Sequence, residues 1–350
     1  MSKKSLIGFI ILFILVLSCK QEIKWGDENQ VIEKEVITPE IEEKSEVSYP
    51  IIVLHGGAGT ITKERLKDGL EEKYKNALDS AIVIGYGLLD SGATALMAVE
   101  KTINFLENHP LFNSGKGAVL NAEGNVELDA SIMDGSNLMA GAVAGVSTVQ
   151  NPISLARLVK DSTKHVLLSG AGAEEFAVSM KVEPIEIEYF ITPKTRAKRE
   201  ERLQRMDKMG TVGCVAIDKN GNIAAGTSTG GMDNKKFGRI GDSPIIGAGT
   251  YANNHTCGVS CTGHGEYFIK NSVAYDMSAL FEYQGMNATQ AAEYIINDKL
   301  KSQNALGGLV AIDKNGKIGI SFNTPGMFWA YRRVGEKAKV GMYESDEKSL

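Results

Sequence analysis

Thr211 is the residue whose place in the sequence gives it the chemistry of a nucleophile. It follows Gly210 at the point where a highly charged segment, residues 194–208, changes abruptly into the apolar run 212–217. Cleavage between Gly210 and Thr211 would leave the threonine with a hydroxyl and a free α-amine. An α-amine has a pKa of about 7.7–8.0 and can accept the hydroxyl proton near neutral pH. The charged segment is then a connector, although a solvated helix face has the same composition.

Two similar hairpins indicate the framework around Thr211. Residues 215–224 (VAIDKNGNIA) recur as residues 310–319 (VAIDKNGKIG), and each copy has apolar runs on both sides of an Asn-Gly turn. Asn-Gly between apolar runs is a strong signal of a β-hairpin. Two copies are too few to predict a solenoid. A further buried strand is expected at residues 51–54.

Helices are expected between the strands in both halves of the chain. Helical spacing of apolar residues, cap residues and stop signals predict helices at 63–90 (capped by Thr62), 93–108, 151–160, 173–180, 265–283 and 288–301. Another hairpin is expected, with strands at 118–120 and 126–129 around the turn 121–124. Because strands and helices come in separate runs, the pattern favours helices covering a stacked pair of antiparallel sheets.

Several separate segments together resemble one family of enzymes. Residues 210–216 (GTVGCVA) and 226–231 (GTSTGG) are similar to the isoaspartyl peptidase/L-asparaginase family of N-terminal-nucleophile hydrolases. The resemblance continues, in order and without a large gap, at residues 55–59 (HGGAG), 112–117 (FNSGKG), 128–135 (LDASIMDG), 238–244 (GRIGDSP), 247–253 (GAGTYAN) and 261–266 (CTGHGE). It extends from about residue 50 to the C-terminus.

The resemblance implies an architecture and an assembly. The fold would be α+β, a four-layer αββα sandwich, with an α subunit at residues 49–210 and a β subunit at residues 211–350. We expect a dimer of these αβ heterodimers. No cofactor is expected, although backbone carbonyls of the loop from Glu107 to Lys116 could hold a structural sodium ion.

The resemblance also assigns roles around the nucleophile. Thr211 would attack after it is released from Gly210 by self-cleavage. Thr229 would hydrogen-bond near the Thr211 hydroxyl and help to activate it, or else simply satisfy a turn. Asn113 would help to orient the nucleophile.

Further residues would bind the substrate. Arg239 and Asp242 would hold its α-carboxylate and α-amine, which their charges suit, although they could instead pair with each other. Thr262 and the Gly263 N–H would form an oxyanion hole, and Gly265 would accept from the substrate amine. These roles imply hydrolysis of the side-chain amide in β-aspartyl dipeptides and L-asparagine.

Two alternatives share parts of this pattern. Glycosylasparaginases have similar segments around Thr211 and Arg239 but lack the His-Gly-Gly of residues 55–57. A surface lipoprotein that only binds amino acids would keep Arg239 and Asp242 but would not need cleavage before Thr211.

Ser228 suggests a third alternative, from another enzyme class. Residues 226–230 (GTSTG) fit the G-x-S-x-G pattern of α/β-hydrolases, and residues 55–57 resemble an esterase oxyanion loop. That pattern requires a strand before the serine and a helix after it. A glycine-rich stretch, residues 230–249, follows Ser228 instead, which argues against this alternative.

The N-terminus predicts export. Two lysines precede the apolar run 6–17, which is short for a membrane-spanning helix and typical of a secretory signal. The run ends in residues 16–19 (VLSC), which resemble a bacterial lipobox. We expect a signal peptide at residues 1–18, lipidation of Cys19, and a disordered tether to residue 48 that holds an exported protein at a membrane. An ordinary signal peptide with an incidental cysteine is the alternative.

Charge and cysteine content argue against several other partners. With 38 Lys and Arg against 43 Asp and Glu, the net charge is −5, which does not favour binding to nucleic acid. After Cys19, three cysteines remain; an odd number argues against a disulfide framework, and Cys214 and Cys261 are expected in the core. The five histidines are scattered, so no catalytic metal is expected.

Overall fold

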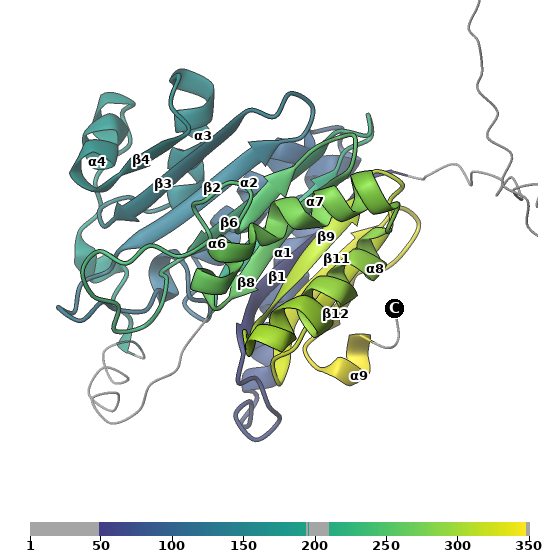
Figure 1. The fold of residues 1–350 in the computed structure, drawn as a ribbon. Helices are drawn as coiled ribbons and strands as arrows, with labels where there is room; N and C mark the ends of the chain where they lie inside the picture. Colours follow the sequence, from purple (N-terminus) through teal and green to yellow (C-terminus); the bar gives the residue numbers. More distant parts are fainter. Residues whose placement is uncertain (1–48, 194, 196–209, 348–350) are drawn as a thin grey trace, which may run out of the picture. The chain divides into compact units, whose positions relative to one another are not determined.

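The computed structural model describes residues 49–193, 195 and 210–347. Two stacked sheets are covered by helices on their outer faces, so the predicted α+β sandwich of four layers is confirmed (Figure 1). The predicted signal peptide, Cys19, the tether and nearly all of the charged connector lie outside the described residues.

The larger sheet contains the strand that begins beside Thr211. Its strand order is β12-β11-β1-β5-β6-β2-β3-β4, and neighbours are antiparallel except for β3 and β4. The strands are β1 (Ile51–Gly59), β2 (Leu128–Asp134), β3 (Ala140–Val146), β4 (Leu167–Ser169), β5 (Val212–Ile217), β6 (Ile223–Thr229), β11 (Gly326–Arg333) and β12 (Lys339–Gly341). Because β5 lies between β1 and β6, Thr211 is at the end of an inner strand.

The smaller sheet packs against the inner strands of the larger one. Its order is β10-β9-β8-β7, all antiparallel, with β7 (Thr250–Ala252), β8 (Cys257–Gly263), β9 (Gly307–Asp313) and β10 (Ile318–Phe322). Strands β8 and β9 face β1, β5 and β6. The two repeated hairpins predicted around residues 215–224 and 310–319 are therefore confirmed, one in each sheet.

The helices divide between the two outer faces. The larger sheet is covered by α1 (Leu70–Asp90), α2 (Ala95–Glu107), α3 (Pro152–Ser162) and α4 (Gly170–Ser179). The smaller sheet is covered by α6 (Gly265–Asn271), α7 (Val273–Gln284) and α8 (Ala288–Glu293), which continues as a π-helical turn at Tyr294–Leu300. Short turns of 3₁₀ helix lie at Gly115–Gly117, Ile187–Tyr189 and Lys301–Gln303, and α9 at Glu344–Glu347. Figure 1 shows α7 and α8 on the near side and α1 and α2 on the far side.

Each repeated hairpin ties its sheet to the helix that covers it. In the first copy, Asp218 accepts hydrogen bonds from its own turn and, through Oδ2, from Ala95 N at the start of α2 (3.1 Å). In the second copy, Asp313 does the same with Ala288 N at the start of α8 (2.9 Å). The aspartate thus satisfies an N–H that a helix leaves unpaired, in addition to closing its turn.

Two predicted helices were too long, because residues in the left-handed conformation interrupt them. Helix α1 begins at Leu70 after Gly69 (φ 75°), whereas Thr62 only closes a turn by accepting from Arg65 N and Leu66 N. The helix predicted at 265–283 is divided at Ser272 (φ 48°) into α6 and α7. A left-handed residue redirects the chain and ends the regular hydrogen bonding of a helix.

The hairpin predicted at 118–129 was wrong, although its turn is present. Asn121 N donates to Asn125 O (2.8 Å), but residues 118–120 form no strand. Strand β2 begins only at Leu128 and pairs with β3 and β6 on its two sides, so neither edge is left for residues 118–120. The N–H of Val119 instead donates to the side chain of Asn113 (2.8 Å).

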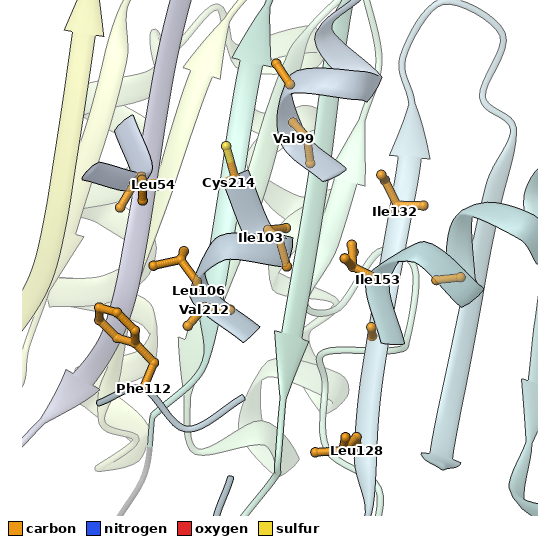
Figure 2. Close-up of a cluster of buried hydrophobic side chains, with 14 of the residues drawn as sticks. Leu54, Val99, Ile103, Leu106, Phe112, Leu128, Ile132, Ile153, Val212 and Cys214 are labelled. Atoms are coloured by element: carbon orange, nitrogen blue, oxygen red, sulfur yellow. The ribbon is translucent and has the colours of Figure 1, made fainter. Parts of the chain in front are cut away.

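A large core fills the space between the larger sheet and its helices. Figure 2 shows side chains of α2 and α3, among them Ile103 and Ile153, against Val212 and Cys214 of β5 and Ile132 of β2. Burying a side chain of this size contributes about 1.5–3 kcal/mol, so this packing holds β5 and β6 firmly. Three free cysteines, Cys214, Cys257 and Cys261, are buried, which confirms the core positions predicted for Cys214 and Cys261. Within the described part, no helix is long and apolar enough to cross a membrane.

Candidate active site

Strand register places Thr211 beside Thr229. Val212 is paired with Ser228 between β5 and β6, so the residue before Val212 lies next to the residue after Ser228. The Thr211 hydroxyl donates to Thr229 Oγ1 at 3.1 Å. Both residues are almost buried, with 7% and 2% of their surface exposed. A threonine at a strand end is thus held against a second hydroxyl, and neither side chain is much exposed to solvent.

Two side chains donate to the carbonyl oxygen of Gly210, which belongs to the peptide bond that self-cleavage would break. Asn113 Nδ2 donates to this oxygen at 2.7 Å and Thr229 Oγ1 donates at 3.1 Å. The Thr229 hydroxyl in turn accepts from Gly231 N at 2.9 Å. Donors at these distances draw electron density toward the oxygen and make the carbonyl carbon easier to attack.

Asn113 is held by hydrogen bonds on both sides of its amide. Its Oδ1 accepts from Val119 N, and Nδ2 also donates to Gly231 O at 2.8 Å. These contacts settle which end of the amide faces the Gly210 carbonyl. The loop after α2 and the loop after β6 are thereby fixed to each other at the site.

His55 supports Thr211 from the other side. Burial lowers the pKa of His55 to about 3, so the ring is neutral near pH 7. Its Nδ1 lies 3.0 Å from Thr211 O and must donate, because that partner is a carbonyl; Nε2, 2.9 Å from Ser260 Oγ, then accepts. Nearby, Gly57 has φ 109° and a Cβ there would lie 3.0 Å from Gly210 Cα, so this approach of β1 requires glycine.

A small pocket opens beside Thr211. Its lining includes Thr229, Arg239, Asp242 and Gly263, which come from both sheets and from the loop after β6. A larger cavity lies between α8, β10 and β11, but none of the predicted site residues lines it. The chemistry therefore places the candidate site at the small pocket.

Asp242 is a buried carboxyl without a full set of partners. It is 5% exposed, and its Oδ2 has no hydrogen-bond partner in the described structure. Burial raises its pKa to about 7, and the nearby Arg239 partly opposes this rise. A cationic group that entered the pocket would relieve the cost of this unpaired oxygen.

Arg239 is paired with a residue that the sequence did not single out as a partner. Its Nε and Nη2 donate to the two carboxylate oxygens of Glu266, at 2.9 and 3.1 Å, and no ion pair with Asp242 is found among the described residues. The Arg239 hydrogen bond is the main reason that the pKa of Glu266 is lowered. A Cβ at Gly265 would lie 2.8 Å from Asp242 Oδ1 and 2.9 Å from Arg239 Nη2, so Gly265 lies against both.

Thr262 and Gly263 end β8 at the same place. Gly263 lines the pocket, whereas Thr262 is fully buried behind it and accepts from Ala58 N at 3.3 Å. The predicted site residues thus meet at one place: Thr211, Thr229, Arg239, Asp242 and Gly263 line the pocket, and Asn113, Thr262 and Gly265 lie next to these. The sequence presents His55 and Glu266 only as parts of the motifs at 55–59 and 261–266, and a polar side chain beside glycines is the signal that marks each of them.

Ser228 has a different position from the one that an α/β-hydrolase requires. It lies within β6, is fully buried, and donates to Glu107 on the helix side of the sheet rather than lining the pocket. The chain after β6 continues as turns and loop up to β7, so the helix that must follow such a serine is missing there.

The loop from Glu107 to Lys116 brings backbone carbonyls close together. A Cβ at Gly117 would lie 2.1 Å from Phe112 O and 2.7 Å from Pro110 O, and one at Gly115 would lie 2.3 Å from Glu107 O. Carbonyl oxygens are suitable ligands for a hard cation, so these residues fit the predicted sodium ion, which stays a prediction. In the described ranges, His, Cys, Asp and Glu side chains do not come together in a group of three or more that could hold a metal ion.

Comparison with known proteins places this geometry in a family. A model of the asparaginase family matches residues 48–342. The isoaspartyl peptidase of Escherichia coli is 44% identical over 307 residues, which cover 84% of this chain and 96% of the relative. That of Salmonella typhimurium is 45% identical over 307 residues (84% and 98%), and the human isoaspartyl peptidase/L-asparaginase is 42% identical over 296 residues (82% and 94%). The chain therefore belongs to the asparaginase family that contains the isoaspartyl peptidases/L-asparaginases.

Proposed function

We propose that this protein is a self-processing amidohydrolase that uses Thr211 to cleave β-aspartyl dipeptides and L-asparagine. The hydrogen bond from Thr211 to Thr229, next to a Gly210 carbonyl held by two side-chain donors, is the observation that carries the proposal. The names of the relatives support the same substrates.

Self-cleavage begins with attack by Thr211 Oγ1 on the carbonyl carbon of Gly210. The new C–O bond forms as the C–N bond breaks, and the hydroxyl proton goes to the departing nitrogen of Thr211. Asn113 and Thr229 stabilise the negative charge that develops on the carbonyl oxygen. Water then hydrolyses the ester, which leaves a carboxylate on Gly210 and a free amine and hydroxyl on Thr211.

The same threonine then acts on the substrate. The α-amine of Thr211 accepts the hydroxyl proton, and Oγ1 attacks the side-chain carbonyl of the aspartyl unit. The C–N bond breaks, the leaving amine or ammonia takes the proton, and water hydrolyses the acyl-enzyme. Thr262 and the Gly263 N–H serve as donors to the oxyanion; the Thr262 hydroxyl accepts from Ala58 N and can direct its own hydrogen into the site.

The clamp on the substrate explains why the side chain, and not the main chain, is cut. Asp242 pairs its free Oδ2 with the α-ammonium, and Arg239 binds the α-carboxylate in place of Glu266 or beside it. Both groups must be free for this binding. An ordinary α-linked peptide has its α-carboxyl group in the peptide bond and is rejected.

The decisive test is the state of the purified chain. Wild-type protein should run as two bands on a denaturing gel, and N-terminal sequencing of the smaller band should begin at Thr211. Thr211→Ala should give one uncut and inactive chain. An intact wild-type chain with full activity on β-aspartyl dipeptides would overturn the proposal.

Substrate comparison separates this function from that of a glycosylasparaginase. We expect a higher kcat/KM for β-aspartyl dipeptides than for a glycosylated asparagine, and no cleavage of α-aspartyl dipeptides. A preference for the glycosylated substrate of about tenfold, which corresponds to about 1.4 kcal/mol of transition-state binding, would move the assignment to the glycosylasparaginases.

The N-terminal sequence supports export and lipid anchoring at Cys19. Wild-type protein should sediment with membranes, and Cys19→Ala should be released or stay unprocessed. Wild-type protein that is wholly in the soluble fraction after export would refute the anchor.

The proposed dimer of αβ heterodimers is tested by sedimentation of the protein without residues 1–48, which should give twice the mass of one cleaved chain.

A further inference from the structure

Glu107, the last residue of α2, is a buried carboxyl that the proposed reactions do not use. It is fully buried, and its Oε1 accepts from Ser228 Oγ at 2.7 Å and from Ile153 N at 2.9 Å. Its Oε2 accepts from Asn151 Nδ2 at 2.9 Å. A carboxyl is costly to bury, even when it is hydrogen-bonded this well, so its position calls for an explanation.

Ser228 links Glu107 to the residue that holds the nucleophile. Side chains alternate between the two faces of a strand, so Ser228 and Thr229 point to opposite faces of β6. Ser228 faces α2 and Glu107, whereas Thr229 faces the pocket and contacts Thr211 and Gly210. A shift of the Ser228 side chain therefore moves Thr229 as well.

Ser114 links the same group to the second carbonyl donor. Ser114 Oγ and Ser228 Oγ are 2.8 Å apart, and both are fully buried. The residue before Ser114 is Asn113, whose amide donates to the Gly210 carbonyl. Glu107, Ser228 and Ser114 thus join, behind the sheet, strand β6 and the loop after α2, whose donors Thr229 and Asn113 meet in front of it.

We propose that Glu107 is a positioning residue for Thr211 chemistry: through Ser228 and Ser114 it fixes Thr229 and Asn113 relative to each other. This inference rests on the proposed function of Thr211. Asn113 and Thr229 donate to the oxyanion in self-cleavage, and Thr229 also contacts the Thr211 hydroxyl that attacks the substrate. A misplacement of such groups by about 1 Å can cost about a hundredfold in rate. The buried carboxylate therefore affects the rate of both self-cleavage and hydrolysis, and it does not affect substrate binding by Arg239 and Asp242.

A purely structural role is the competing explanation, because Glu107 also caps α3 by accepting from Ile153 N. Asp218 provides the matched control. It is a buried carboxyl that accepts from Ala95 N at the start of α2, but it lies at the opposite end of β5 from Thr211. Loss of a helix cap costs about 1 kcal/mol at either place, whereas only Glu107 is connected to Thr229.

The experiment compares Glu107→Leu, Glu107→Gln, Ser228→Ala and Asp218→Asn. For each, one measures the half-time of self-cleavage on a denaturing gel, kcat and KM on a β-aspartyl dipeptide, and Tm. Glu107→Leu and Ser228→Ala should slow self-cleavage and lower kcat by about tenfold or more, with KM changed less than about twofold. Glu107→Gln keeps an acceptor for Ser228 and should restore most of kcat. Asp218→Asn should lower Tm but leave kcat unchanged.

Several outcomes would overturn the inference. If Ser228→Ala keeps the wild-type kcat and rate of self-cleavage, the inference is overturned. Ser228→Ala removes only a hydroxyl, so this result is informative even if Glu107→Leu fails to fold. An equal loss of kcat in Asp218→Asn would assign the effect to general stability. Failure of the proposed function is recognised separately, because the wild-type protein itself would then neither cleave before Thr211 nor hydrolyse the dipeptide.

Discussion

Replacing Thr229 by valine removes one hydroxyl from the centre of the site and little else. Valine has nearly the same size and the same branching at Cβ, and residue 229 is buried in the last position of β6. The hydroxyl takes part in three contacts: it accepts from Thr211 Oγ1 (3.1 Å) and Gly231 N (2.9 Å) and donates to Gly210 O (3.1 Å). The change thus removes one of two side-chain donors to the carbonyl under attack.

The expected size of the effect follows from these contacts. Loss of one oxyanion donor typically costs about 2.7–4 kcal/mol, or a factor of about 10²–10³ in rate. Gly210 O keeps the donor from Asn113, so self-cleavage should be slowed and not abolished. Because Gly231 N–H loses its acceptor inside the protein, the free energy of unfolding should fall by about 1–3 kcal/mol.

The assay is a time course of self-cleavage after synthesis in a cell-free system, with samples separated on a denaturing gel. Thr229→Ser keeps the hydroxyl and serves as the control, with a rate within about tenfold of wild type, since it lacks only a methyl group. If Thr229→Val cleaves itself within about threefold of the wild-type rate, the Thr229 hydroxyl does not assist attack, and this reasoning is refuted.

Three further predictions follow from the charged and titratable groups. Arg239→Ala should leave self-cleavage intact but raise KM, because loss of a charge-assisted pair costs about 1.5–3 kcal/mol; unchanged kinetics on both substrates would make Arg239 structural. Asp242 must be ionised to bind the α-ammonium, and burial raises its pKa to about 7. Log kcat/KM should therefore fall with a slope near two below pH 7, one proton from Asp242 and one from the Thr211 amine, and the residual activity of Asp242→Asn should show a slope near one. Burial lowers the pKa of His55 from 6.5 to about 3, so His55 binds a proton more readily in the unfolded chain than in the folded one. The contribution of neutral His55 to the free energy of unfolding is therefore complete above pH 6.5 and is lost as pH falls toward 3. Urea unfolding at pH 7 and pH 5 should show the stability advantage of wild type over His55→Gln shrinking by about 2 kcal/mol, and a constant difference would contradict it.

Local signals in the sequence were sufficient for much of the framework. The Asn-Gly signals predicted both repeated hairpins, because a short turn determines the pairing of its adjacent strands; in the structure each turn contains three residues, 219–221 and 314–316. The helix predicted at 151–160 is present as α3, with Pro152 in its first turn. Local signals failed where a strand distant in the sequence pairs with the expected partner. Residues 118–120 were expected to pair with the start of β2, but β3 and β6 occupy both edges of β2.

The sequence by itself determined which residues are candidates for the chemistry: a threonine that follows a glycine, an arginine and an aspartate suited to an amino acid, and the family motifs around them. Only the tertiary structure decided how they are paired. It set Arg239 against Glu266 and not against Asp242, left Asp242 Oδ2 without a partner, and turned Ser228 toward Glu107, away from the pocket. The physical reason is that residue type and spacing encode charge, hydroxyl groups and turns. Which groups meet, and which stay unpaired, depends on strand register and on packing between segments that are far apart in the chain.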